Sequence, residues 1–341
     1  MGCPENVSGQ TPRRQGILSR LAALHEQSNT GRLATGRSRV DLHCHTTASD
    51  GGLSSIELVG QAASLGIEVL AITDHDTTDG VPGALTEGQR QGIIVVPGVE
   101  ISAVSEREEI HLLGYFVDPE NAELQTLLSR AREARRVRAK EMLDRLAKLG
   151  LPIEWNRLIE VSGDSSSIGR PHVATTLLEA GHVSSYDEAF DLWIGRGGPA
   201  YVERYKLSPQ EAVSLLKRGG GLPVLAHPYI YSRTGDRKLA LDLKHWLPRL
   251  REAGLEGIEV YYPNYPASAR RHLLALAVKH GLLITGGSDF HGGVLGNGLG
   301  GVAVPWAVWE GLERRHRLTQ ARPSKGMRAP ADGVSGTPST G

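Results

Sequence analysis

The sequence predicts an α/β protein whose centre is a barrel of seven strands. Amphipathic helical stretches, among them residues 53–65, 209–217 and 267–280, separate most of a set of short apolar runs. Buried strands that alternate with helices are typical of a parallel β/α architecture. Potential metal ligands follow nearly every run, which favours a barrel because the carboxyl ends of barrel strands meet at one mouth. The expected strands are residues 40–42, 69–72, 93–96, 110–116, 223–226, 257–261 and 282–285.

The first expected strand leads into two histidines, His43 and His45, and Asp50 follows five residues later. Side chains alternate along an extended chain, so histidines two residues apart point to the same face. One such pair is weak evidence for a metal site, but the pattern recurs at four more strands. The ligand-type residues there are His75, Glu100, His111, His227, Asp289 and His291.

Three segments do not fit the barrel pattern. Residues 118–205 contain a long helical run at 121–149 and more helical pattern at 171–193, which predicts a helical insertion that caps the barrel mouth. Residues 1–37 and 314–341 are polar or basic and lack the apolar content of a folded unit, so we expect disordered tails. The barrel itself is then expected at 38–117 and 206–313.

The composition is that of an ordinary globular chain. Of 341 residues, 40% are apolar and 22% are charged, and the formal net charge is zero. Without a net positive field, any contact with a polyanion must be local. Two cysteines, no apolar run of membrane-spanning length and no signal-peptide core lead us to expect a cytoplasmic protein without a membrane partner. No feature indicates an obligate protein partner.

The kinds of ligand indicate the chemistry. Imidazole and carboxylate without a set of thiolates suit Mn²⁺, Fe²⁺ or Zn²⁺ better than Ca²⁺. Nine ligands are too many for one ion but suffice for two or three, and Glu100 can bridge because a carboxylate has two oxygens. Ions about 3.5–4 Å apart can bind a phosphate and lower the pKa of a bridging water towards neutrality. We therefore expect a metal-dependent phosphoesterase in which a metal-bound hydroxide attacks phosphorus.

Several motifs together resemble the PHP (polymerase and histidinol phosphatase) superfamily. The resemblance covers roughly residues 39–310 and is nearest to the branch that contains 3′,5′-nucleoside bisphosphate phosphatase and ribonuclease AM. No ligand of the family pattern is missing, and the tails match nothing known. The motifs are Asp41-Leu42-His43-Cys44-His45, Ile72-Thr73-Asp74-His75-Asp76, Pro97-Gly98-Val99-Glu100, Glu109-Ile110-His111-Leu112-Leu113-Gly114, Arg170-Pro171-His172-Val173-Ala174, Ala200-Tyr201-Val202, Ala226-His227-Pro228 and Gly287-Ser288-Asp289-Phe290-His291.

The resemblance implies a distorted seven-stranded β/α barrel with a trinuclear metal site, for which we expect Mn²⁺. Carried over position by position, it implies three ligand sets. They are His43, His45, Glu100 and Asp289 for the first ion, Asp50, His75 and His291 for the second, and Glu100, His111 and His227 for the third.

The candidate substrate contacts are Arg170, His172, Arg135 and Arg138. Arginine offers a fork of donors that matches phosphate, and Arg170 and His172 precede a helix-like stretch whose N-terminus attracts anions. The alternative for the arginines of residues 130–140 is a solvated helix face. His172 is also the candidate general acid that would protonate the leaving group. Asp74 and Asp76 are expected to orient ligands or form turns, and Glu259 to be structural.

Four functions stay open at this point. The leading hypothesis is a phosphatase that removes the 3′-phosphate of nucleoside 3′,5′-bisphosphates, with 5′-to-3′ trimming of short single-stranded RNA as an extension. The second is a small-molecule phosphatase of the histidinol phosphate type. The third is a non-catalytic or proofreading accessory module, as PHP domains occur within DNA polymerases. The fourth is a metal-storage barrel, which would not need an arginine-lined cap.

Overall fold

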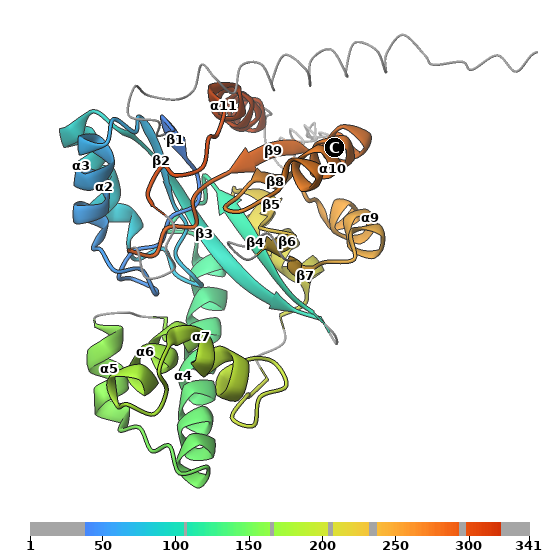
Figure 1. Ribbon diagram of the computed structural model, residues 1–341. Helices are drawn as coiled ribbons and strands as arrows, with labels where there is room; N and C mark the ends of the chain where they lie inside the picture. Colours follow the sequence, from blue (N-terminus) through green and yellow to red (C-terminus); the bar gives the residue numbers. More distant parts are fainter. Residues whose placement is uncertain are drawn as a thin grey trace, which may run out of the picture.

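A computed structural model describes residues 38–105, 108–163, 167–203, 207–231, 237–292 and 298–321. The predicted seven-stranded barrel is confirmed: one sheet runs in the order β1-β2-β3-β4-β5-β8-β9 (Figure 1). It is nearly closed, because Leu42 N donates to Gly286 O (3.2 Å) and His45 N donates to Phe290 O (2.9 Å) across the first and last strands. The strands are β1 Val40–Asp41, β2 Val69–Ile72, β3 Ile94–Val104, β4 Glu109–Tyr115, β5 Leu222–Leu225, β8 Gly257–Tyr261 and β9 Leu283–Gly286.

One strand departs from the expected parallel arrangement. Strand β4 runs antiparallel to both of its neighbours, β3 and β5, while the other neighbouring strands within the sheet are parallel. Only four residues connect β3 to β4, whereas a parallel crossover needs about a dozen or more. The hairpin pairs Ser102 with His111, so His111 enters the mouth from the start of its strand. A second, two-stranded sheet that was not predicted pairs β6 (Tyr229–Tyr231) with β7 (Arg237–Ala240).

Amphipathic helices cover the outside of the barrel. Ser54 and Ser208 begin two of them with a capping box in which the helix's third residue, a glutamate, bonds back to the serine. In Figure 1, α2 and α3 lie beside β1 and β2, while α9 and α10 lie on the other side. The helices are α2 Ser55–Ser64, α3 Val81–Gln91, α8 Pro209–Arg218, α9 Leu243–Ala253, α10 Ala267–His280 and α11 Trp306–Gln320.

Helix α11 corrects the expected start of the C-terminal tail. It continues to Gln320, seven residues past the predicted end of the barrel at 313. The His316 ring stacks on Phe116 with 3.9 Å between ring centroids, and Arg315 forms an ion pair with Glu256. These contacts order residues whose composition alone suggests a solvated tail. The remainder of both predicted tails, 1–37 and 322–341, lies outside the described residues.

Residues 122–194 are mostly helical, as Figure 1 shows below the barrel. The longest helix, α4 (Ala122–Lys148), has 27 residues, and the side chain of its N-cap residue Asn121 accepts the Leu124 amide. Its first half packs into the barrel core through Leu124 and Leu128. Its second half joins a separate apolar cluster through Met142 and Leu146. Helix α4 therefore connects two cores. The other helices are α5 Trp155–Ser162, α6 Arg170–Glu179, α7 Tyr186–Glu188 and the π-helix η2 Ala189–Ile194.

No helix in the described ranges is long and apolar enough to cross a membrane.

Candidate metal centre

All nine predicted ligands lie together at the barrel mouth. Ligand atoms within 4.8 Å of one another form three overlapping groups. The first two reproduce the sets implied by the family resemblance, with His45 shared between them. The third holds His75 in place of His227, which nevertheless lies close to the same carboxylate. The groups are His43, His45, Glu100 and Asp289; His45, Asp50, His75 and His291; and His75, Glu100 and His111.

Glu100 is the central carboxylate and is fully buried. Its two oxygens face different histidines. Oε1 lies 2.8 Å from His111 Nδ1 and 2.9 Å from His227 Nε2. Oε2 faces three more rings at 3.2–3.3 Å, those of His43, His45 and His75. This division of histidines between two oxygens is the arrangement that a bridging carboxylate needs.

Local backbone geometry brings the ligands to one point. His43 and His45 flank Cys44, which is buried on the opposite side and pairs with Phe290 in a parallel bridge. Asp289 has a φ of +51°, a left-handed conformation that aspartate tolerates better than most residues. Gly287 lets two chain segments touch, because a Cβ there would lie 2.4 Å from His43 N.

The histidines of the centre act on the pKa values of its buried carboxylates. Burial alone would raise the pKa of the Glu100 carboxyl, but His75 and the other rings around it hold that pKa well below its usual range. Asp50 and Asp289 have lowered pKa values for the same reason. Burial disfavours protonation of His45, yet Asp289 and Glu100 raise its pKa to about 10. The three carboxylates are therefore ionised and call for positive charge beside them.

The donor set fits divalent ions. Among the described residues, three buried atoms at the centre make no hydrogen bond of normal geometry: His45 Nδ1, His75 Nδ1 and Asp50 Oδ1, although His75 Nδ1 lies 3.2 Å from Glu100 Oε2. Buried polar atoms are rarely left so, and a metal ion satisfies nitrogen and carboxylate lone pairs at once. Protons and metal ions compete for the same imidazole nitrogens. The site therefore has the chemistry of an imidazole–carboxylate metal centre.

Two residues outside the ligand groups, Glu259 and Tyr262, support the candidate ligands. Glu259 Oε1 lies 3.1 Å from His43 Nδ1, and its Oε2 accepts the His227 amide at 2.8 Å. Tyr262 donates its hydroxyl to Asp289 Oδ2 at 2.7 Å. Such partners fix the ring orientation and tautomer of a ligand. The signal for Glu259 was its position near the end of the sixth strand; Tyr262 gave none, because its partner is distant in sequence.

Asp74 and Asp76 do not join the ligand groups. Asp74 accepts hydrogen bonds from the Thr46 amide and hydroxyl, each 2.7 Å long, and from the Ser49 hydroxyl. Asp76 accepts the Ser102 amide at 3.1 Å and pairs with Arg135 at 2.6 Å. The two carboxylates on either side of His75 therefore hold its backbone against neighbouring segments.

The predicted substrate contacts differ in what they touch. Arg170 Nη2 donates to Glu109 Oε2 at 3.2 Å, and Glu109 Oε1 lies 3.0 Å from His111 Nε2. Arg170 and His111 border a cavity of about 170 Å³, which His227 also lines. His172 Nδ1 accepts the Gly169 amide, and burial lowers the pKa of that ring.

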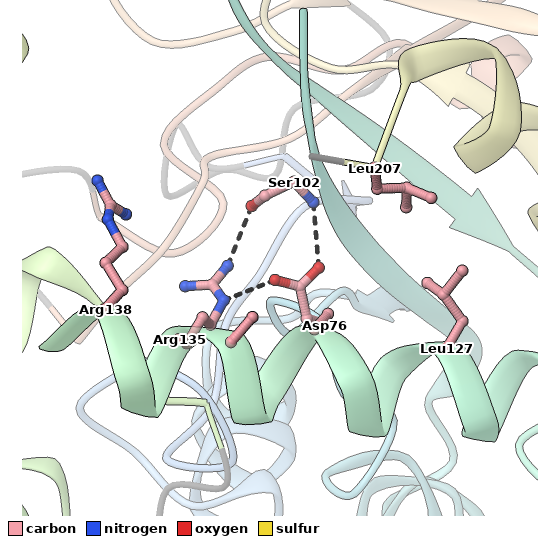
Figure 2. Close-up of a pocket in the computed structure, with 8 residues that line it drawn as sticks. Asp76, Ser102, Leu127, Arg135, Arg138 and Leu207 are labelled. Atoms are coloured by element: carbon pink, nitrogen blue, oxygen red, sulfur yellow. Dashed lines mark hydrogen bonds and ion pairs between the residues drawn. The ribbon is translucent and has the colours of Figure 1, made fainter. Parts of the chain in front are cut away.

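The other two arginines lie on α4. Arg138 is buried and donates to the Val202 carbonyl at 2.7 Å. Arg135 is buried beside Asp76 and Ser102 (Figure 2), and it is not among the residues that line the cavity bordered by Arg170. Tyr186, at the start of α7, was not singled out from the sequence. Burial raises the pKa of the Tyr186 hydroxyl above its usual value, and the Asp50 charge acts in the same direction.

Comparison with known proteins places this site in a family. The PHP domain family matches residues 41–190. The chain is 35% identical over 281 residues to a 5′-3′ exoribonuclease of Escherichia coli, covering 79% of this chain and 93% of the relative. It is 33% identical over 254 residues to the 3′,5′-nucleoside bisphosphate phosphatase of Chromobacterium violaceum, covering 74% and 87%.

Two further proteins are similar over comparable lengths. A phosphoribosyl 1,2-cyclic phosphate 1,2-diphosphodiesterase of Eggerthella lenta is 35% identical over 255 residues, which is 74% of this chain and 94% of the relative. A solved structure from Bifidobacterium adolescentis, described as a metal-dependent phosphoesterase, superimposes with a TM-score of 0.73 at 34% identity, covering 81% of this chain and 96% of that one. Motifs, barrel, ligand cluster and relatives agree: the chain belongs to the PHP family of metal-dependent phosphoesterases.

Proposed function

We propose that the chain hydrolyses the 3′-phosphate of nucleoside 3′,5′-bisphosphates, giving a nucleoside 5′-monophosphate and phosphate, and that it trims short RNA from the 5′ end. The observation that carries this proposal is the ligand cluster around Glu100, with Arg170 at the start of α6 bonded to Glu109, which contacts His111. The relatives named as a bisphosphate phosphatase and as an exoribonuclease support the same substrate class.

The proposed centre holds two or three Mn²⁺ ions, with Fe²⁺ or Zn²⁺ as alternatives. Glu100 is the proposed bridging ligand, because its two oxygens face separate groups of histidines. When bound, divalent ions supply charge that neutralises phosphoryl oxygens and lowers the pKa of a coordinated water. The proposed ligand sets remain His43, His45, Glu100 and Asp289; Asp50, His75 and His291; and Glu100, His111 and His227.

The chain's own residues would orient the substrate. Arg170 at the edge of the cavity offers a bidentate donor to the second phosphate, in place of its present contact with Glu109. Arg138 is the second proposed phosphate contact. Neutral His172 accepts the Gly169 amide at Nδ1, which leaves its proton on Nε2 as a donor. We propose that His172 donates this hydrogen bond to the phosphate or to the leaving oxygen.

A second candidate is hydrolysis of a cyclic phosphodiester on a phosphorylated ribose. The relative from Eggerthella lenta favours it, because its identity to this chain equals that of the exoribonuclease. Both reactions need the same metal-bound phosphate and a site for a second phosphate. They differ in whether the ester bond to be broken closes a ring.

The proposal is tested by incubating Mn²⁺-loaded protein with five substrates and measuring released phosphate and, for the oligomer, released mononucleotides. These are adenosine 3′,5′-bisphosphate, AMP, histidinol phosphate, a 5′-phosphorylated oligoribonucleotide and a phosphoribosyl 1,2-cyclic phosphate. We expect AMP and phosphate from the bisphosphate and mononucleotides from the oligomer. Preferential turnover of histidinol phosphate or of the cyclic ester would instead move the chain to that activity, and inactivity on all five would contradict the proposal.

A further inference from the structure

Arg135 is bonded to two residues that lie close to candidate ligands in the sequence. Its side chain is 5% exposed, and Nε donates to Asp76 Oδ2 at 2.6 Å. Nη2 donates to Ser102 Oγ at 3.0 Å. Figure 2 shows this guanidinium reaching from α4 to both partners, while Arg138 points away from them. The cavity beside it measures about 20 Å³, room for about one water molecule and none for a nucleotide.

Both partners of Arg135 belong to the backbone that carries candidate ligands. Asp76 follows His75 directly, and its amide donates to the Glu100 carbonyl at 2.9 Å. Ser102 lies two residues after Glu100 on β3 and is paired with His111 on β4. The Ser102 amide also donates to Asp76 Oδ1 at 3.1 Å. Arg135, Asp76 and Ser102 thus close a ring of hydrogen bonds behind the ligands.

The backbone of Asp76 has an unfavourable conformation that its neighbours must stabilise. Its φ is +54°, in the left-handed region that costs a non-glycine residue free energy. Helix α4 contacts this residue twice, because Arg132 Nη1 also donates to the Asp76 carbonyl at 3.2 Å. Arg132 and Arg135 are three residues apart and so share one face of the helix. Helix α4 therefore fixes both the backbone and the side chain of Asp76.

We infer that Arg135 is a positioning residue of the metal centre and not a substrate contact. By holding Asp76 and Ser102, it fixes the segments that present His75 and Glu100. This inference rests on the proposed metal centre. It also assigns a role to the first half of α4, the helix that joins the barrel core to the second apolar cluster: the placement of α4 sets the geometry of the ligands.

The test measures metal binding in folded variants. Arg135→Met is compared with Arg136→Met, the next residue of α4, whose side chain is 46% exposed. We expect Arg135→Met to weaken at least one Mn²⁺ by about 10-fold to 100-fold in titration calorimetry and to change the Mn²⁺ EPR spectrum, as loss of a ligand's supporting partner does. The value of kcat should fall with KM little changed. Arg135→Lys should recover part of the affinity, and Arg136→Met should match wild type.

Loss of Arg135 leaves Asp76 as a buried, unpaired charge, which destabilises a protein strongly. If circular dichroism shows that Arg135→Met does not fold, the double variant Arg135→Met/Asp76→Asn is measured instead, because it also removes the Asp76 charge. We expect the same loss of Mn²⁺ affinity. Wild-type Mn²⁺ affinity in a folded variant, or a raised KM at unchanged kcat, would overturn the positioning role alone. Wild-type protein that binds no Mn²⁺ would overturn the metal centre and the positioning role together.

Discussion

At the scale of single residues, the defining feature of the metal centre is buried negative charge. Three ionised carboxylates lie within contact distance of six histidines at the barrel mouth. Glu100 contacts five of these rings, so its loss would remove a contact from more histidines than the loss of any other ligand in the described centre. Removing one ligand should therefore affect metal binding more than removing a residue that only supports one.

His75→Ala and Asp289→Ala test the ligands directly. Each removes a proposed ligand without opening the apolar core, so we expect phosphate release to fall by more than the ~10–100-fold typical of supporting residues while the fold persists. Circular dichroism and phosphate release measure both properties. His245→Ala, on the exposed face of α9, is the control. Near wild-type turnover in either ligand variant would show that the ligand assignment is wrong.

Glu259→Gln tests a supporting residue. The amide keeps the size of the side chain but loses the charge that faces His43 Nδ1. We expect Mn²⁺ affinity to fall by about 10-fold, measured by titration calorimetry. Glu252→Gln, on the exposed surface of α9, should bind Mn²⁺ like wild type. Equal affinities for the two variants would mean that Glu259 is only structural.

At the scale of elements, the sequence predicts where strands lie better than how they are connected. The apolar runs gave all seven barrel strands, but nothing in the composition of residues 110–116 shows their direction. The expected strands left 13 residues between 96 and 110, but β3 continues to Val104, so only four residues connect it to β4 and the turn is antiparallel. For α11 the sequence failed to predict the extent of the helix. Its last turns contact Phe116 and Glu256, and both contacts join residues far apart in the sequence.

Two leucines of α11 test how it is attached. Leu312 is fully buried against the barrel, whereas Leu318 is 57% exposed. Leu312→Ala should lower the free energy of unfolding by about 2–5 kcal/mol, because it removes a buried side chain and leaves a cavity. Leu318→Ala should change it by less than about 0.5 kcal/mol. Chemical denaturation measures both, and similar losses for the two would mean that α11 does not pack as described.

At the scale of the whole molecule, the candidate ligands were predictable and their surroundings were not. His43, His75 and Glu100 sit in short motifs beside strands, so sequence spacing reveals them. Glu259 and Arg135 act on partners 216 and 59 residues away, and only the folded chain brings them together. The arginines of α4 are an example. The sequence pattern suggested the same role for Arg135 and Arg138, but Arg135 contacts Ser102 and Arg138 contacts the Val202 carbonyl.

Metal removal tests how far the centre stabilises the whole barrel. A ligand that binds only the folded state stabilises it by about 2.7 kcal/mol at 100 times its Kd. We expect EDTA to lower Tm and abolish phosphate release, and excess Mn²⁺ to restore both. Differential scanning calorimetry follows the first effect, with Ca²⁺ as the control ion because it prefers an all-oxygen site. A Tm that neither EDTA nor Mn²⁺ changes would contradict metal binding to the folded chain.

The most direct test of the central claim is anomalous X-ray diffraction from crystals soaked in Mn²⁺, with data collected on both sides of the manganese absorption edge. We predict at least two peaks at the barrel mouth that share the Glu100 carboxylate, with histidine nitrogens as their other protein ligands. Peaks elsewhere and none at Glu100, in crystals of protein that hydrolyses a phosphate ester, would contradict it.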